Sequence, residues 1–250
     1  MSMEPSQILQ GLADKYAQCR TYSDNGVVDF DDVKGNKEQI DFKTHFIRPQ
    51  HFSFEWQDYG PRRGKSTEFS LLWSMNSETL TRYQWGIEEK QDLRMAIAAA
   101  TGCSAGAAHI VPALLLEEIR LESKHLLQLG DLQLLQNEEL DGKDCYVLKG
   151  SIFKHHDHTL WISIKDFALI GVYVDKSWTA EESERDHNAL LANTELMARL
   201  TEKGIAPPTE MKHKDTRFVT LYTYKDVCFD RPIQPLPDPR GHHGSRAENS

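Results

Sequence analysis

The sequence predicts an α+β fold in which a curved antiparallel sheet of about ten strands forms an incomplete barrel, with helices covering its concave face. Three observations lead to this prediction. Two regions alternate apolar and polar residues with period two, an alanine-rich stretch of helix formers lies between them, and turn residues separate the segments. So many strands strain a flat open sheet, and we therefore expect it to curl and leave an apolar hollow beneath the helices.

The composition fits one large domain and excludes several partners. The chain has 250 residues, of which 39% are hydrophobic, enough to bury a core. Its 29 basic and 38 acidic residues give a net charge of −9, whereas nucleic acids and anionic membranes are bound by a concentrated basic face. We therefore expect no nucleic-acid partner and at most transient membrane contact. The single predicted sheet gives one domain over residues 1–230, followed by a tail at 231–250 that we expect to be flexible or laid loosely on the surface.

The first elements are a helix and five strands. Residues 6–18 carry apolar residues at helical spacing, with Ser6 as the expected cap (Ile8, Leu9, Leu12 and Tyr16). Strands are predicted at 22–30, 39–48, 51–59, 67–75 and 79–85. Alternation is clearest near residue 54, where three aromatic residues share one face (Phe52, Phe54 and Trp56).

A helical insertion is predicted at 88–130. Helices are expected at 93–100 and 109–129, separated by a break at 101–106. The 22 residues between Arg94 and Glu117 carry no formal charge and are long enough to cross a bilayer. Polar residues within the stretch, including Ser104 and His109, and the small transfer energy of its alanines favour helices that lie on the sheet.

The second β region begins near residue 131. Strands are predicted at 131–139, 143–153, 158–164 and 170–176, with Asp141-Gly142 as a two-residue hairpin turn. An extra helix at 180–203 has Thr179 as its N-cap and Gly204 past its end. A last strand at 217–229 precedes the tail.

No pattern for catalysis, metal binding or a cofactor is present, so we expect neither an enzyme nor a cofactor site. The cluster His155-His156-Asp157-His158 fits a solvated hairpin tip better than a metal site, because neighbouring strand residues point to opposite faces. Cys103 is expected to be a small buried residue rather than a reactive thiol. The widely spaced cysteines permit either four free thiols or two disulfides (Cys19, Cys103, Cys145 and Cys228).

Aromatic residues and one arginine are the remaining candidates for function. The tryptophans and phenylalanines of the strands either fill the core or line a pocket for an apolar ligand. Arg48 ends an apolar strand just before Pro49. Its guanidinium group could extend to water, or it could donate hydrogen bonds to carbonyl groups of a helical lid.

Several short motifs, in this order and spacing, resemble the LolA/LolB-like superfamily of periplasmic lipoprotein carriers and outer-membrane lipoprotein-sorting proteins. They are Phe-Ile-Arg-Pro at 46–49, His-Phe-Ser-Phe-Glu-Trp at 51–56, Leu-Trp-Ser-Met-Asn at 72–76, Asp-Gly-Lys-Asp-Cys-Tyr-Val-Leu at 141–148 and Thr-Leu-Trp-Ile-Ser-Ile at 159–164. The resemblance covers roughly residues 6–230. The chain departs from the family in its longer alanine-rich insertion and its extra helix.

The resemblance implies an incomplete barrel whose apolar cavity takes up acyl chains. It places Arg48 at the position of an arginine that bonds the lid and keeps the empty form closed. On this basis we expect seven residues to contact a ligand (Arg48, Phe46, Phe52, Phe54, Trp56, Trp73 and Leu115).

The expected function is non-enzymatic binding or transport of lipid or lipoprotein acyl chains in the cell envelope. The alternative is an envelope interaction or sensor module that uses the same fold to bind a protein partner. The resemblance implies a periplasmic location, with the signal peptide removed or absent from this sequence.

Overall fold

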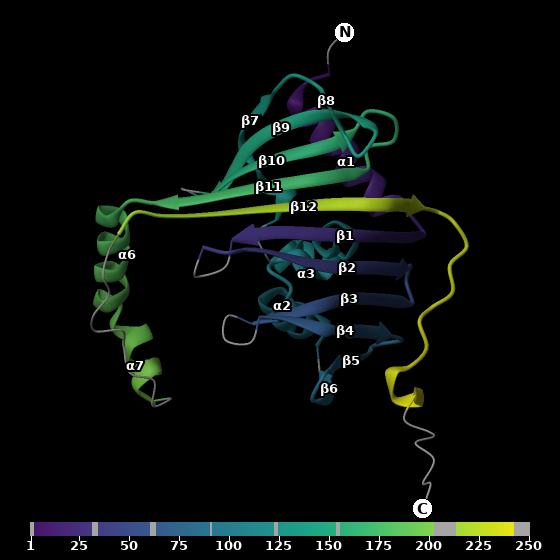
Figure 1. The fold of residues 1–250 in the computed structure, drawn as a ribbon, viewed down its shortest axis with the longest axis horizontal. Coiled ribbons are helices and arrows are strands. Elements are labelled where there is room, and N and C mark those ends of the chain that lie inside the picture. Colours follow the sequence, from purple (N-terminus) through teal and green to yellow (C-terminus); the bar gives the residue numbers. More distant parts are fainter. Residues whose placement is uncertain are drawn as a thin grey trace, which may run out of the picture.

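The computed structural model describes residues 3–31, 35–60, 64–90, 92–122, 125–153, 156–202 and 214–242. Its main feature is one antiparallel sheet of twelve strands that runs in the order β6-β5-β4-β3-β2-β1-β12-β11-β10-β9-β7, with β8 paired to β9 (Figure 1). The two ends of this order do not pair, so the barrel stays open and the predicted α+β half-barrel is confirmed.

The strands are β1 (Thr21–Asp31), β2 (Lys37–Ile47), β3 (His51–Gly60), β4 (Gly64–Met75), β5 (Glu78–Tyr83), β6 (Gly86–Lys90), β7 (Gly130–Leu134), β8 (Glu138–Leu140), β9 (Lys143–Phe153), β10 (His156–Ser163), β11 (Leu169–Trp178) and β12 (Thr216–Phe229). The expected segment 79–85 corresponds to β5 and the turn after it, whereas β6 is not predicted and its last residues lie in the segment expected as the helical insertion. The expected segment 131–139 divides into β7 and β8. The predicted turn at Asp141-Gly142 is confirmed, because both residues have the positive φ angles that a tight hairpin turn requires.

Helix α1 (Pro5–Gln18) begins one residue earlier than predicted, and its cap is not Ser6. Glu4 is the N-cap, and its backbone N–H donates to the side chain of Gln7 at 3.0 Å in a reciprocal capping box. Pro5 occupies the first helical position, where its fixed φ is favourable and no N–H is needed. Ser6 therefore lies inside the first turn.

The insertion is a series of short helices rather than two long ones. They are α2 (Leu93–Cys103), α3 (Ala107–Ile110), α4 (Pro112–Leu115), α5 (Glu117–Glu122) and the 3₁₀ turn η1 (Leu126–Gln128). The expected helix at 109–129 is wrong, because Pro112 starts a new turn and Leu116 adopts an extended conformation with φ −105° and ψ 112°. Over the described ranges, none of the helices combines the length and the apolar character that crossing a bilayer requires.

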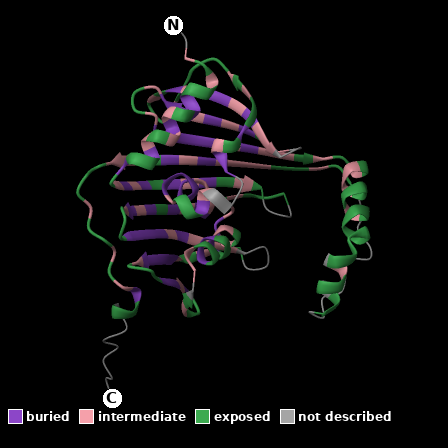
Figure 2. Cartoon of the chain, turned by 180° about the vertical axis from the view of Figure 1, so that it is seen from behind, coloured by how far each residue is buried: buried purple, intermediate pink, exposed green. Residues whose placement is uncertain are grey.

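The core lies between the concave face of the sheet and these helices. Apolar residues of α1, α2, α3 and α4 belong to the same buried cluster as the inward residues of the central strands. Figure 2 shows buried residues along the strands and the helices that cross them. Five alanines of the insertion are almost fully buried, and their small side chains let the helices approach the sheet closely (Ala96, Ala100, Ala107, Ala108 and Ala113). Ala98 and Ala99, on the other face of α2, are exposed.

Beyond the half-barrel, β11 and β12 continue as a two-stranded arm that carries α6 (Ala180–Ala192) and α7 (Thr194–Glu202) (Figure 1). The expected helix 180–203 is divided at Asn193, which leaves the helical region with φ −77° and ψ 90°. Thr179 is the N-cap as predicted, and its hydroxyl accepts from the N–H of Glu182. Gly204 lies outside the described residues. No described residue of α6 is buried, and Figure 2 shows the arm helices exposed.

The first part of the tail lies along the outside of the sheet. The carbonyl of Leu236 accepts a hydrogen bond from the indole N–H of Trp73 at 2.9 Å, and Arg240 forms an ion pair with Glu78 at 2.7 Å. Residues 231–242 are therefore laid on the sheet surface, one of the two arrangements expected of the tail. Residues 243–250 lie outside the described part.

Candidate ligand-binding site

The floor of the candidate site is an aromatic patch on the concave face of β2 and β3. Cross-strand partners share a face, and Phe46 pairs with Phe52 while Phe42 pairs with Trp56. The rings of Phe42 and Phe54 stack with centroids 5.7 Å apart. These residues pack in one buried cluster with the helical insertion, α2 to η1, which we call the helical cover. Side chains of the cover and of the aromatic floor occupy the space between them.

Arg48 connects three elements at one end of this patch. Its Nε donates to the carbonyl of Cys19 at 3.2 Å, and its Nη2 donates to the carbonyls of Tyr16 at 3.4 Å and Leu115 at 3.1 Å. Its guanidinium carbon lies 5.0 Å from the centroid of the Phe46 ring. Because Leu115 ends α4 while Tyr16 and Cys19 lie at the end of α1, this side chain joins the helical cover to the rest of the core.

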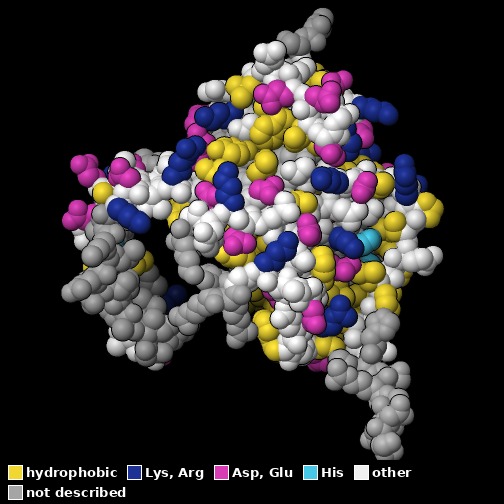
Figure 3. All heavy atoms as spheres, in the orientation of Figure 1, with side chains coloured by type: hydrophobic (Ala, Val, Ile, Leu, Met, Phe, Trp, Pro, Cys, Tyr) yellow, Lys and Arg dark blue, Asp and Glu magenta, His cyan; other side chains and the backbone are white. Residues whose placement is uncertain are grey.

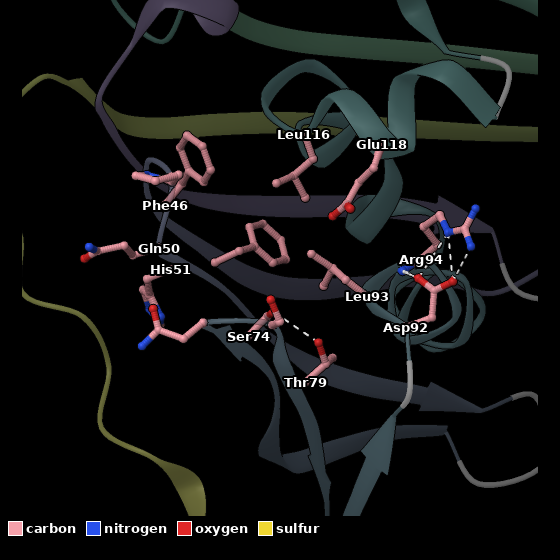
Figure 4. A pocket seen from close by; sticks show the side chains of 14 residues that line it. Phe46, Gln50, His51, Ser74, Thr79, Asp92, Leu93, Arg94, Leu116 and Glu118 are labelled. Atoms are coloured by element: carbon pink, nitrogen blue, oxygen red, sulfur yellow. Dashed lines mark hydrogen bonds and ion pairs between the residues drawn. The ribbon is translucent and has the colours of Figure 1, made fainter.

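A groove with a cavity volume of about 610 Å³ opens beside Arg48. Its apolar walls are Phe46 and Phe52 from the sheet and Leu93 and Leu116 from the insertion. Figure 4 shows Leu93 and Leu116, from different helical segments, directed into the same space as Phe46. The volume falls within the range of about 300–1,000 Å³ that is usual for small-molecule sites.

The rim of the groove is polar. Asp92 caps α2 by accepting from the N–H of Arg94 at 2.8 Å, and its carboxylate also accepts from the Arg94 guanidinium, which lowers the pKa of Asp92 (Figure 4). The hydroxyl groups of Ser74 and Thr79 lie 3.1 Å apart across the β4–β5 turn. Burial lowers the pKa of His51 to about 4, so this imidazole is neutral at neutral pH. An apolar floor with a polar rim fits an amphiphilic ligand.

The expected site residues do not all lie on this side of the sheet. Of the seven, Phe46 and Phe52 line the groove, whereas Phe54, Trp56 and Leu115 are buried in the cluster on the concave face. Trp73 does neither, because it belongs to a separate cluster with Leu71 and Leu80 that the tail covers at Leu236. The expectation that Trp73 lines the hollow is therefore corrected.

Two features of the site were not anticipated from the sequence. Leu93 begins α2 and Leu116 caps the end of α4. At such helix boundaries the apolar periodicity of the sequence does not indicate where a side chain points. A second tie between sheet and cover is the hydroxyl of Tyr222, which donates to the carbonyl of Ala105 at 2.7 Å. Gly106 follows with φ +95°, and a Cβ there would come within 2.6 Å of the same hydroxyl, so this contact requires glycine.

The sequence offered His155-His156-Asp157-His158 and Cys103 as groups to examine for metal binding and catalysis. Across the described residues, no three His, Cys, Asp or Glu side chains are placed to hold a metal ion, and His155 lies outside that part of the chain. Burial and the negative charge of Asp58 raise the pKa of the Cys103 thiol, which disfavours a reactive thiolate. All four cysteines lie in the described ranges and are free.

The outer face of the sheet carries mixed charge. Figure 3 shows Lys and Arg interspersed with Asp and Glu over the strands, with no concentration of one sign on the face in view. This distribution agrees with the net charge of −9, which argues against a nucleic-acid surface.

No protein-family model matches the sequence, and the search of curated proteins found no match. Solved structures do match. One is a LolA superfamily protein from Nitrosomonas europaea, with 10% identity, a TM-score of 0.32, and coverage of 94% of this chain and 96% of that one. A second is a putative outer membrane lipoprotein-sorting protein domain from Vibrio parahaemolyticus, with 9% identity, a TM-score of 0.35, and coverage of 92% and 93%.

A third match is the MucA/MucB complex of Pseudomonas aeruginosa, with 10% identity and a TM-score of 0.43. It covers 93% of this chain, whereas this chain spans only 59% of that one.

Proposed function

We propose that the chain is a non-enzymatic binding protein of the cell envelope that takes up acyl chains of lipids or lipoproteins under its helical cover. The observation that carries this proposal is the arrangement around Arg48, where one side chain joins α4 to α1 next to a groove with an apolar floor and a polar rim. A cover held by a few polar bonds can open and close, which a protein that must release its cargo requires.

The energy of such binding comes from burial of methylene groups. Each contributes about 0.8 kcal/mol when removed from water, so twelve offer roughly 10 kcal/mol before the cost of ordering the chain. The groove accommodates the first part of a chain without rearrangement. A longer chain requires the helical cover to move away from the aromatic floor, since their side chains occupy the rest of the concave face.

An uncharged acyl probe tests the proposal. We expect a fluorescent diacylglycerol to bind the purified chain and Leu116→Asp to weaken that binding at least tenfold, because a carboxylate would stand among Phe46, Phe52 and Leu93. Leu190→Asp is the matched control, because Leu190 is exposed on α6 in the arm. Absence of binding, or equal weakening by both substitutions, would refute an acyl site at the groove.

The second candidate function is binding of a protein partner, and the arm favours it. Phe218, Leu190 and Leu191 are exposed on β12 and α6, away from the core. Large exposed apolar residues on a projecting element are typical of contact surfaces. Native mass spectrometry of the protein purified from its own cells separates the two functions, since a carrier retains lipid and an interaction module retains a polypeptide.

A further inference from the structure

A second pocket, separate from the groove, is lined by imidazoles and one lysine. It has a volume of about 230 Å³ and lies between the helical cover and β9–β12. His109 of α3 and His125 before η1 face it from the cover, while His156 and His158 of β10 and Lys176 of β11 face it from the sheet. The remaining walls are mainly apolar (Ile110, Leu126, Ile152, Val172, Val174 and Tyr222). It shares no lining residue with the groove.

The pocket lining carries one lysine and, among its described residues, no Asp or Glu, which favours binding of an anion. The two nearest acids in the sequence are engaged elsewhere: Asp157 pairs with Lys149 at 3.0 Å, and Asp175 pairs with Arg217 at 2.6 Å. Within the described part of the chain, Lys176 has no ion-pair partner. In a chain of net charge −9, this pocket therefore has basic residues in its lining and, among its described lining residues, no carboxylate to balance Lys176.

His158 adds a defined proton acceptor. Its Nδ1 lies 3.1 Å from the carbonyl of His156, which can only accept, so the neutral ring carries its proton on Nδ1. Its Nε2 then presents a lone pair and makes no hydrogen bond among the described residues. When this Nε2 takes up a proton, it can donate a hydrogen bond to an anion that lies beside Lys176.

We propose that this pocket binds the carboxylate head of a single-chain amphiphile, such as a fatty acid, at Lys176 and His158. The apolar walls surround the first methylenes of the chain. His109 also lines a second hollow of about 360 Å³, in which Met95, Ile97 and Ile119 offer apolar surface to the rest of the chain. This hollow is also lined by Asp92, Arg94 and Glu118, which line the acyl groove as well, whereas the pocket at Lys176 and His158 shares no residue with the groove.

Burial lowers the pKa of His158 to about 4. The hydrogen bond to the His156 carbonyl and the charge of Asp157 oppose this shift, whereas the charges of His156 and Lys176 act in the same direction as burial. Burial also lowers the pKa of His109. The pKa of His125 is lowered by burial and by the charge of His109. A backbone hydrogen bond of Arg120 raises the pKa of His125, while the charge of Arg120 lowers it. A bound carboxylate places a negative charge next to His158, which favours the charged imidazolium and therefore raises the pKa of His158.

Nuclear magnetic resonance of the imidazole C2–H protons tests this directly with the full chain. The His158 resonance is assigned by its loss in His158→Gln, and its pH titration is recorded with and without dodecanoate. We expect dodecanoate to raise the pKa of His158 by at least one unit. Dodecanol, which lacks the charge, and acetate, which lacks the chain, should leave it unchanged at the same concentration.

Two lysine substitutions complete the test. Lys176→Met should abolish the dodecanoate effect, whereas Lys149→Met should retain it, because Lys149 pairs with Asp157 outside the pocket. A His158 titration that dodecanoate does not move, or that it moves equally in Lys176→Met, would overturn the proposal. If the diacylglycerol fails to bind, the proposed acyl groove is refuted, but the effect of dodecanoate on His158 is unaffected. The two experiments therefore test the groove and the Lys176 pocket separately.

Discussion

Replacing Arg48 with leucine should loosen the helical cover without unfolding the half-barrel. Of the three carbonyls that Arg48 bonds, only that of Leu115 belongs to the cover. Opening the cover therefore breaks one charge-assisted hydrogen bond, whose loss costs about 1.5–3 kcal/mol. That free energy corresponds to a rise of roughly ten- to hundredfold in the open population.

Native-state hydrogen exchange measures this population. In Arg48→Leu, amides at 112–119 should exchange about ten to a hundred times faster, whereas those of β9, β10 and β11 should be unaffected. Arg217→Leu is the matched control, because Arg217 pairs with Asp175 on the arm and touches no helix of the cover. Unchanged exchange at 112–119, or faster exchange everywhere, would refute the role of Arg48 as a tie between α4 and α1.

Three further predictions concern other buried polar groups. Tyr222→Phe removes the hydrogen bond to Ala105 and should speed amide exchange at 104–108 about fivefold, the effect of about 1 kcal/mol, with no change at 112–116. Burial raises the pKa of Asp24 in the folded state from its ordinary value of about 4 to about 6. Ionisation of this carboxyl therefore favours the unfolded state, and the free energy of unfolding falls as the pH rises from about 4 to 6. Asp24→Asn should therefore gain up to about 3 kcal/mol relative to the parent between pH 4 and pH 7.5 in urea unfolding, and a pH-independent difference would contradict this reasoning. Cys103→Ala should leave any ester hydrolysis by the purified chain unaltered, since the thiol is not activated; loss of turnover in an esterase assay would show otherwise.

The strands were predictable because period-two alternation reports burial on one face of a sheet. The positions of β1 to β4 differ from expectation by at most three residues at either end. Alternation does not say which face is concave, and this explains the misplacement of Trp73. In the structure Trp73 pairs with Ser53, whereas Leu72 pairs with Phe54, so Trp73 faces away from the aromatic floor.

The insertion was less predictable because its composition favours helix at every position. Alanines and leucines support one long helix from 109 onward, yet Pro112 begins a new turn and Leu116 is extended. The end of α4 lies where Arg48 reaches its last carbonyl, so tertiary contacts outweigh local propensity there. Contact between Arg48 and the cover was suggested by the family resemblance, while the pocket at Lys176 depends on pairing between distant strands that the sequence does not display.

The most direct test of an acyl site under the cover is a crystal structure with an uncharged, terminally brominated dodecanoate ester. The account predicts an anomalous bromine peak in the space bounded by Phe46, Phe52 and Leu116. At saturating ester, a groove that contains only ordered water, with Arg48 still bonded to Leu115, would contradict it.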